Sequence, residues 1–390
     1  MDFSKLYFLK QSRLIHLCIS ITFFTSGVIV NVAQCLLYLT IRPFSKTIYR
    51  KINWYLCWTI YSQLVFVGDW WSETKIFFYI DKEEFNKYYG KEHAYCIMNH
   101  TYEVDWLIGW MMAERIGVLG NCKAYAKKII QYIPVLGWGW KCSDFVFLER
   151  NFDKDKEIIN RQITELAEHP DPIWLLLFPE GTRFTKKKHE AAIEFAKKQN
   201  LPQLKYHLLP RTKGFVASLP SMIGKVPAIY DIELAFKESD PNAPTITSML
   251  FGKPLEAHFS LRRIPMEDLP QSDEDREKFL RDLFVQKDKM KASFIETGDF
   301  FSTSGVKRVE PFELERRIYP LLNVIFWQFA TSVPICYYLV KMLFSGELLY
   351  FSIGAGIVGA FFLLLKKTIG MSEIKKGSSY GSGPTPKKNQ

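Results

Sequence analysis

Cysteine and histidine are both scarce in this chain of 390 residues, with seven of each. The number of cysteines is odd and no Cys-x-x-Cys spacing occurs, so the sequence predicts neither a disulfide framework nor a zinc site. Several of the cysteines fall in apolar runs, where the thiol behaves as a small hydrophobic group. We therefore expect reduced, buried thiols, as in a domain that faces the cytosol.

Several motifs of catalytic and nucleotide-binding proteins are also missing. The sequence contains no GxSxG elbow, no metal-ligand cluster and no GxxxxGK[ST] phosphate loop. Five histidines show no ligand-like spacing with one another: His93, His169, His189, His207 and His258. This inventory argues against a metal-dependent hydrolase, and it favours direct group transfer over a covalent intermediate on the protein.

The net charge of +10 indicates a partner that is anionic, either nucleic acid or a membrane surface and anionic substrates. No zinc finger, helix-turn-helix or RNA-binding sheet pattern is present. Much of the basic surplus lies beside apolar runs, at Arg42, Lys46, Arg50, Lys51, Arg316, Arg317, Lys366 and Lys367. We therefore expect membrane lipid as a partner and no nucleic acid.

Three charge-free apolar runs cover residues 15–41, 318–340 and 348–365. A membrane span needs roughly 20 apolar residues to cross the hydrocarbon core, and the first two runs reach that length. The third is shorter but rich in Gly and Ala, as membrane helices often are. The segment Trp54–Trp71 carries only Asp69 as a charge and indicates an interfacial or re-entrant helix. The first run lacks the features of a cleaved signal peptide, so we interpret it as a retained anchor.

The distribution of these runs predicts four parts of the chain. Basic residues flank the first run on both sides, which favours a helical hairpin in one leaflet over a lone span. Basic pairs bracket the two C-terminal runs, so both ends of that hairpin should be cytosolic. The parts are N-terminal membrane-anchoring helices at 1–72, a catalytic domain at 73–300, a linker and transmembrane hairpin at 301–367, and a disordered cytosolic tail at 368–390.

The middle part alternates short apolar runs with amphipathic, charged ones. Buried strands are predicted at 94–98, 145–148, 173–178 and 226–232, and helices at 153–169, 188–200 and 273–294. This alternation predicts an α/β domain whose mixed, largely parallel sheet is flanked by helices.

Asn99–Asp105 contains a histidine followed five residues later by a carboxylate. On one continuous helix His100 and Asp105 would point about 140° apart and would not meet. They can meet if His100 lies in the turn after the 94–98 strand and Asp105 lies in the first turn of a following helix. The carboxylate would then orient the imidazole as a general base. The alternative is a loop histidine that is merely hydrogen-bonded to a local carboxylate.

Phe178–Arg183 predicts a sharp turn that follows a buried strand. Pro179 and Gly181 set the turn, and Gly181 allows backbone N–H groups to approach a ligand closely. Arg183 offers a planar fork suited to phosphate. Further cationic side chains that are candidates for this site are Arg150, Arg211 and Lys213. The alternative interpretation is that each of them is a solvated surface residue.

Taken together, these motifs resemble the 1-acylglycerol-3-phosphate acyltransferase family. Four blocks match in order and spacing, at 99–105, 145–150, 178–183 and 226–229. The stretches 90–94, 205–215 and 376–381 resemble the animal gamma/delta branch. Two positions depart from the commoner pattern: Glu103 stands where many members have Ser or Thr, and Glu149 replaces an Asp.

The resemblance implies transfer of an acyl group from acyl-CoA to the sn-2 hydroxyl of lysophosphatidic acid, giving phosphatidic acid. It implies that His100 is the base and that Asp105 holds it. The residues implied to bind the acceptor are Arg150, Glu180, Gly181, Thr182 and Arg183. No cofactor is implied, because acyl-CoA is a substrate. The alternatives are an acyltransferase for another lysophospholipid, such as lysophosphatidylinositol or lysocardiolipin, and an inactive membrane scaffold.

The last four residues, at 387–390, resemble a dilysine retrieval signal of endoplasmic-reticulum membrane proteins, and a charged solvated tail is the alternative. Together with the apolar runs, this resemblance implies a multi-pass protein of the endoplasmic reticulum membrane with a cytosolic catalytic domain. The oligomeric state is left open.

Overall fold

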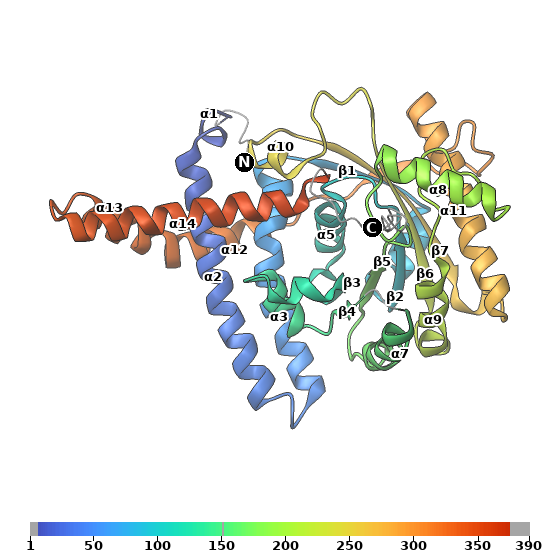
Figure 1. Cartoon of the computed structure of the whole chain (residues 1–390), viewed down its shortest axis with the longest axis horizontal. Helices are drawn as coiled ribbons and strands as arrows, with labels where there is room; N and C mark the ends of the chain where they lie inside the picture. The colour runs from blue at the N-terminus through green and yellow to red at the C-terminus, as the bar shows by residue number, and fades with distance from the viewer. Residues whose placement is uncertain (1–6, 150–151, 375–390) are drawn as a thin grey trace, which may run out of the picture.

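The computed structural model describes residues 7–149 and 152–374. After the short helix α1 (Tyr7–Lys10), helices α2 (Arg13–Thr40) and α3 (Lys46–Phe66) form a hairpin. The side chain of Ser45 caps α3 by accepting a hydrogen bond from the N–H of Ile48 at 3.2 Å. A π-helical turn, η2 (Val67–Trp71), then leads into the α/β domain (Figure 1).

The domain is built on an eight-stranded sheet with the order β4-β3-β5-β2-β6-β7-β1-β8. Strand β2 lies between β5 and β6 and is parallel to both. Antiparallel pairs occur between β6 and β7 and between β1 and β8, so the sheet is mixed and largely parallel, as predicted. The strands are β1 (Lys75–Tyr79), β2 (Ala94–Met98), β3 (Cys122–Lys127), β4 (Val146–Leu148), β5 (Trp174–Leu177), β6 (Ala228–Phe236), β7 (Glu256–Pro265) and β8 (Pro311–Glu313).

Helices cover both faces of this sheet (Figure 1). Every residue of β2 is buried, as expected for a central parallel strand. Because side chains alternate along a strand, Tyr95 and Ile97 pack with α7, α9 and α11, whereas Cys96 and Met98 pack with α5 and the membrane helices. The helices of the domain are α4 (Lys82–Tyr88), α5 (Asp105–Ile116), η3 (Leu119–Asn121), η4 (Lys128–Tyr132), α6 (Leu136–Lys141), α7 (Phe152–Ala167), α8 (Lys186–Lys198), α9 (Thr212–Met222), α10 (Ile246–Leu250), η5 (Met266–Asp268) and α11 (Asp273–Thr297).

The four predicted strands are present as β2, β4, β5 and β6, and the three predicted helices as α7, α8 and α11. Strands β1, β3, β7 and β8 were not predicted. β3 contains Lys123 and Lys127, and β7 begins with Glu256 and has two arginines near its end, so neither is a long continuous apolar run. β8 lies beyond residue 300 and pairs with β1, so the sheet extends past the expected end of the catalytic part.

The C-terminal part is a helical hairpin that protrudes from the domain (Figure 1). It consists of α12 (Tyr319–Trp327), η6 (Gln328–Ser332), α13 (Val333–Leu343) and α14 (Leu348–Ser372). In the described part of the chain, three segments are long and apolar enough to span a membrane: α2, α12–α13 and α14. Most of the apolar window of α2 is buried inside the protein (61%), against 6% for α14. The C-terminal hairpin therefore exposes its apolar surface, while α2 packs largely within the molecule.

Three hydrogen bonds join the membrane helices to each other and to the domain. Helix α14 crosses α2, where the hydroxyl of Ser20 donates to the carbonyl of Phe361 at 3.1 Å. Between α2 and α3, Gln34 Nε2 donates to Asn53 Oδ1 at 2.9 Å, and Asn53 Nδ2 donates to the carbonyl of Cys142 at 3.0 Å. Asn53 thus links both helices of the N-terminal hairpin to the segment that follows α6.

Replacing Asn53 tests this link. Asn53→Ala removes the acceptor of the buried Gln34 Nε2 and one of the donors to the carbonyl of Cys142, and a buried donor that loses its partner costs about 1–3 kcal/mol. We expect a lower thermal unfolding midpoint in detergent. Ile52→Ala is the matched control, because Ile52 is the preceding residue of α3 and is exposed. Equal midpoints for the two variants would contradict the structural role of Asn53.

Candidate active site

Directly after β2, the side chain of Asn99 joins the end of this strand to β6. Asn99 is fully buried, and its amide accepts a hydrogen bond from Leu234 N at 2.8 Å and donates one to Leu234 O at 3.0 Å. These two hydrogen bonds have the pattern of a β-ladder pair, and they fix the end of β2 against β6. His100 therefore follows a rigid strand end rather than a mobile loop.

His100 and Asp105 meet, as the spacing predicted for a turn followed by a helix. Asp105 is the first residue of α5, and its Oδ2 lies 3.0 Å from His100 Nδ1. The same carboxylate accepts the N–H of Tyr102 at 3.0 and 3.1 Å, and it is fully buried. Burial raises the pKa of Asp105, and the hydrogen bonds from His100 and Tyr102 oppose that shift.

The geometry leaves one edge of the imidazole available. Because a carboxylate can only accept, Nδ1 of His100 carries the proton and Nε2 is left with its lone pair. The ring stacks on Phe178, with centroids 4.1 Å apart and planes 21° apart. The side chain is 17% exposed and borders a pocket, so Nε2 is placed to accept a proton from a ligand there.

The turn after β5 lies beside His100 because β5 is parallel to β2 and ends at the same edge of the sheet. The N–H of Gly181 donates to Phe178 O at 2.9 Å and closes the turn. Gly181 has φ +69°, and a Cβ there would lie 3.0 Å from Cδ of Arg211. Glycine is therefore required by both the backbone and the neighbouring side chain. Phe184 N donates to His100 O at 2.9 Å and ties the two segments together.

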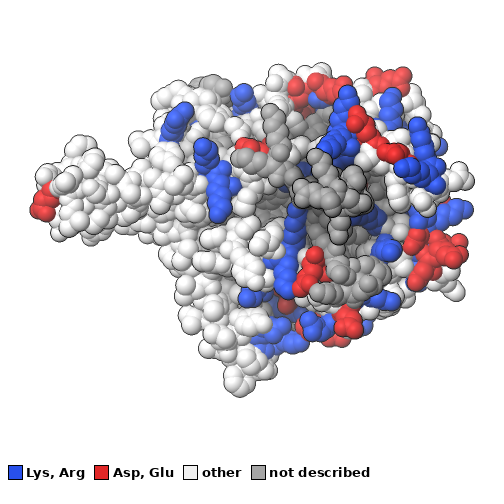
Figure 2. Space-filling view, in the orientation of Figure 1, with Lys and Arg blue, Asp and Glu red and all other residues white. Residues whose placement is uncertain are grey.

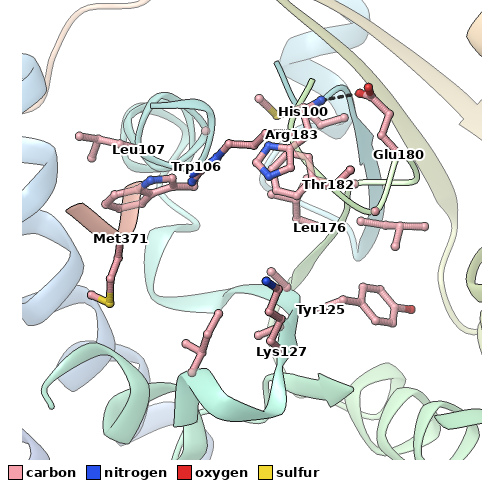
Figure 3. Close-up of a pocket in the computed structure, with 18 of the residues that line it drawn as sticks. His100, Trp106, Leu107, Tyr125, Lys127, Leu176, Glu180, Thr182, Arg183 and Met371 are labelled. Carbon is pink, nitrogen blue, oxygen red and sulfur yellow. Dashed lines mark hydrogen bonds between the residues drawn. The ribbon is translucent and has the colours of Figure 1, made fainter. Parts of the chain in front are cut away.

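Glu180 links the backbones of two loops at this site. Its Oε1 accepts His100 N at 2.6 Å, drawn as the dashed line in Figure 3, and its Oε2 accepts Leu208 N at 3.0 Å. The side chain is 2% exposed. Burial raises the pKa of Glu180, while the nearby His207 and the two backbone donors oppose that shift. These contacts are those of a positioning residue, and direct binding of a substrate by Glu180 stays a prediction.

Thr182 and Arg183 line the same pocket as His100 (Figure 3). The hydroxyl of Thr182 accepts a hydrogen bond from Lys188 Nζ at 2.5 Å. Burial lowers the pKa of Arg183, and the carboxylates of Asp105 and Glu103 oppose that shift, so the guanidinium lies within electrostatic reach of both. Arg211 and Lys213 also border the pocket, whereas Arg150 lies outside the described residues. The roles predicted for these residues stay predictions.

The pocket is large, with a volume of about 1930 Å³. It extends from His100 past β3 and α6 to the membrane helices, where Phe23 of α2 and Thr368 of α14 line it. Trp106, Lys127 and Met371 also border it and were not predicted from the sequence (Figure 3). Lysine and arginine side chains gather on the domain's side of the molecule, while the protruding hairpin is almost free of charge (Figure 2).

A second group missed by sequence reasoning is a buried charged cluster behind Glu180. His207 is buried, with Nδ1 3.0 Å from Asp288 Oδ1 and Nε2 3.1 Å from both oxygens of Glu233. Since both ring nitrogens face carboxylates, both must donate, and the ring is an imidazolium. Burial opposes this charge, but Glu233 and Asp288 raise the pKa of His207 to about 9.

This cluster holds the loop that contacts Glu180. Asp288 accepts the N–H groups of Lys205 and Tyr206 at 2.8 and 2.7 Å, just before His207. The next residue, Leu208, donates to Glu180, which in turn accepts His100 N. The partners of His207 lie 26 and 81 residues away in the chain, so no local pattern could have revealed them.

Comparisons with known proteins identify relatives over almost the whole chain. An acyltransferase family model matches residues 77–230, and an acyltransferase C-terminus model matches residues 248–327. The chain is 37% identical to human (Homo sapiens) 1-acyl-sn-glycerol-3-phosphate acyltransferase gamma, over 98% of this chain and 99% of that relative. It is 38% identical to the delta enzyme of Rattus norvegicus, over 96% of each chain.

A solved structure, that of the 1-acyl-sn-glycerophosphate acyltransferase PlsC from Thermotoga maritima, is also similar. The likeness covers 73% of this chain and 98% of that chain, with 14% sequence identity and a TM-score of 0.42.

The two family models make this chain an acyltransferase, and its three long apolar segments indicate association with a membrane. The chain belongs to the 1-acylglycerol-3-phosphate acyltransferase family, and its full-length relatives include the gamma and delta enzymes. The family resemblance found in the sequence motifs is thereby confirmed.

The buried imidazolium makes a prediction about pH. The folded-state pKa of His207 is about 9, above the ordinary value of 6.5, so its stabilisation is present below about pH 6.5 and is lost as the pH rises through 9. Thermal unfolding midpoints of the wild type and His207→Gln should therefore differ most near about pH 6 and converge toward about pH 10.

His258→Gln is the matched control, because His258 is also buried but burial lowers its pKa to about 4. His258 stays neutral between about pH 6 and pH 10, so the difference in unfolding midpoint between His258→Gln and the wild type should not shrink as the pH rises. If the difference in unfolding midpoint between the wild type and His207→Gln does not change with pH, His207 is neutral in the folded protein.

Proposed function

We propose that this protein transfers an acyl group from acyl-CoA to the sn-2 hydroxyl of lysophosphatidic acid, giving phosphatidic acid. The observation that carries the proposal is the His100–Asp105 pair, which opens with Arg183 into one pocket that continues to the membrane helices. Both relatives described above are named as 1-acyl-sn-glycerol-3-phosphate acyltransferases, which supports the same acceptor.

In this mechanism, Nε2 of His100 accepts the proton of the acceptor's sn-2 hydroxyl. The oxygen forms a bond to the thioester carbonyl carbon, the carbon–sulfur bond then breaks, and the coenzyme A thiolate leaves. The acyl group passes directly to the acceptor, so no acyl-enzyme forms. The imidazolium then returns its proton to the thiolate. Asp105 stabilises the imidazolium while it exists. Proton transfer by a positioned base is worth about 10²–10⁴-fold in rate.

Arg183 is the residue proposed to bind the phosphate of the acceptor. A guanidinium presents two parallel donors to a phosphate, and a partly buried one is less screened by water. Arg211 and Lys213 border the same pocket and add positive potential. Holding the acceptor's phosphate fixes the hydroxyl relative to Nε2, and such orientation lowers the barrier further.

The size of the pocket supports two lipid-like substrates rather than one small ligand. Pockets for drug-sized ligands have volumes of about 300–1,000 Å³. The volume here is about 1930 Å³, and its lining extends to α2 and α14. Acyl chains can therefore remain among apolar side chains while the head group and the thioester reach His100.

The proposed location is the endoplasmic reticulum membrane, with the catalytic domain in the cytosol. Support comes from the three apolar segments and from the basic pairs, Arg316–Arg317 and Lys366–Lys367, that bracket the C-terminal hairpin. The dilysine-like residues 387–390 lie outside the described residues.

The test is acyl transfer from radiolabelled acyl-CoA to lysophosphatidic acid in detergent. His100→Ala should lower kcat by about 10²–10⁴-fold, because the base is removed. His189→Ala is the control: His189 lies on α8, where it bonds the carbonyl of Leu204 at 2.8 Å, and it should leave kcat almost unchanged.

Two outcomes would contradict the proposal. Turnover of His100→Ala at the wild-type rate would remove the proposed base. A panel of lysophospholipids on which the wild type shows no preference for lysophosphatidic acid would reject the proposed acceptor.

A further inference from the structure

Glu103 lies inside the His100–Asp105 motif but takes no part in the proposed chemistry. Its Oε1 accepts the N–H of Ile374 at 3.0 Å, a contact between residues 271 positions apart. Ile374 is the second residue after α14, so this bond holds the end of the C-terminal hairpin against the loop that carries His100. The departure from the commoner Ser or Thr at position 103 thus coincides with a contact to the C-terminal segment.

The end of α14 forms part of the wall of the catalytic pocket. Lys367, Thr368, Met371 and Ile374 all line the pocket that contains His100. In the close-up of Figure 3, Met371 borders the pocket on the side of Trp106, the second residue of α5. The same helix is mostly exposed along the protruding hairpin, so one continuous helix connects an apolar surface with the reaction site.

The substrate that this wall contacts can be argued from the position of Arg183. Arg183 lines the pocket beside His100, and in Figure 3 Trp106 lies between Arg183 and Met371. A phosphate bound at Arg183 would therefore sit close to the docked end of α14. From there the pocket lining continues along Leu364 of α14 to Ser20 of α2 and Gln328 of η6. An acyl chain attached to that phosphorylated glycerol has an apolar path along α14.

We propose that Glu103 is a positioning residue that docks the end of α14, and that Met371 is a specificity-determining residue for the acyl chain of the lysophospholipid acceptor. This inference rests on the proposed function, because it assigns the chain of that function's acceptor to one wall of the site.

The test compares long-chain with short-chain lysophosphatidic acid, using one acyl-CoA donor. Met371→Trp adds bulk to the wall and should lower the ratio of kcat/KM for the long-chain over the short-chain acceptor by about tenfold. Leu363→Trp is the matched control, since Leu363 lies on the same helix but is exposed and outside the pocket lining. It should keep the wild-type ratio.

Glu103 is tested by a pair of variants. Glu103→Ala removes the acceptor of the Ile374 N–H and should shift the same ratio, because the wall is no longer held. Glu103→Gln keeps a carbonyl oxygen that can accept this bond and should keep the wild-type acceptor preference. If Glu103 acts through the docked helix, adding Met371→Trp to Glu103→Ala should change the ratio by less than it does in the wild type.

The outcomes separate this inference from the proposed function. Absence of transfer to any lysophosphatidic acid by the wild type would refute the function itself. Normal transfer with an unchanged acceptor ratio in Met371→Trp would overturn the inference alone. A change in preference among acyl-CoA donors, without a change among acceptors, would also overturn it, because the wall would then serve the donor chain.

Discussion

The site depends on the contact between the buried carboxylate of Asp105 and the imidazole of His100. A buried carboxylate is costly unless its oxygens are satisfied, and here they accept both the Nδ1–H of His100 and the N–H of Tyr102. Its place at the start of α5 adds the favourable field of a helix N-terminus. One interaction thereby fixes the turn, the tautomer of the ring and the direction of Nε2.

The parallel order of the central strands brings the other parts of the site to this pair. β2 and β5 end at the same edge of the sheet, so His100 and the Phe178–Arg183 turn are neighbours. Glu180 accepts hydrogen bonds from the backbone of His100 and of Leu208. The imidazolium of His207 contacts Glu233 and Asp288, and these contacts hold the loop that carries Leu208. The positions of the reacting groups therefore depend on buried carboxylates that accept hydrogen bonds from backbone N–H groups and from histidine side chains.

The sequence predicted those features that are encoded locally. His100 and Asp105, five residues apart, can meet only if a strand, a turn and the start of a helix follow one another, so their spacing predicted this arrangement. The turn at Gly181 was predicted from its proline and glycine. Continuous apolar runs revealed β2 and β5, whereas the interleaved lysines of β3 concealed that strand. Partners that are distant in the chain gave no pattern, as for His207 with Asp288 and for Glu103 with Ile374. Arg150 was predicted from the sequence and lies outside the described residues.

The most direct test of the central contact is kcat of Asp105→Asn with lysophosphatidic acid and acyl-CoA. An amide at this position can donate to Nδ1, which moves the ring proton to Nε2 and removes the base while nearly preserving the shape of the side chain. The account predicts that kcat falls by about 10⁴-fold with the unfolding midpoint little changed. A folded Asp105→Asn enzyme with wild-type kcat would show that the carboxylate does not set the state of His100, and the account would be wrong.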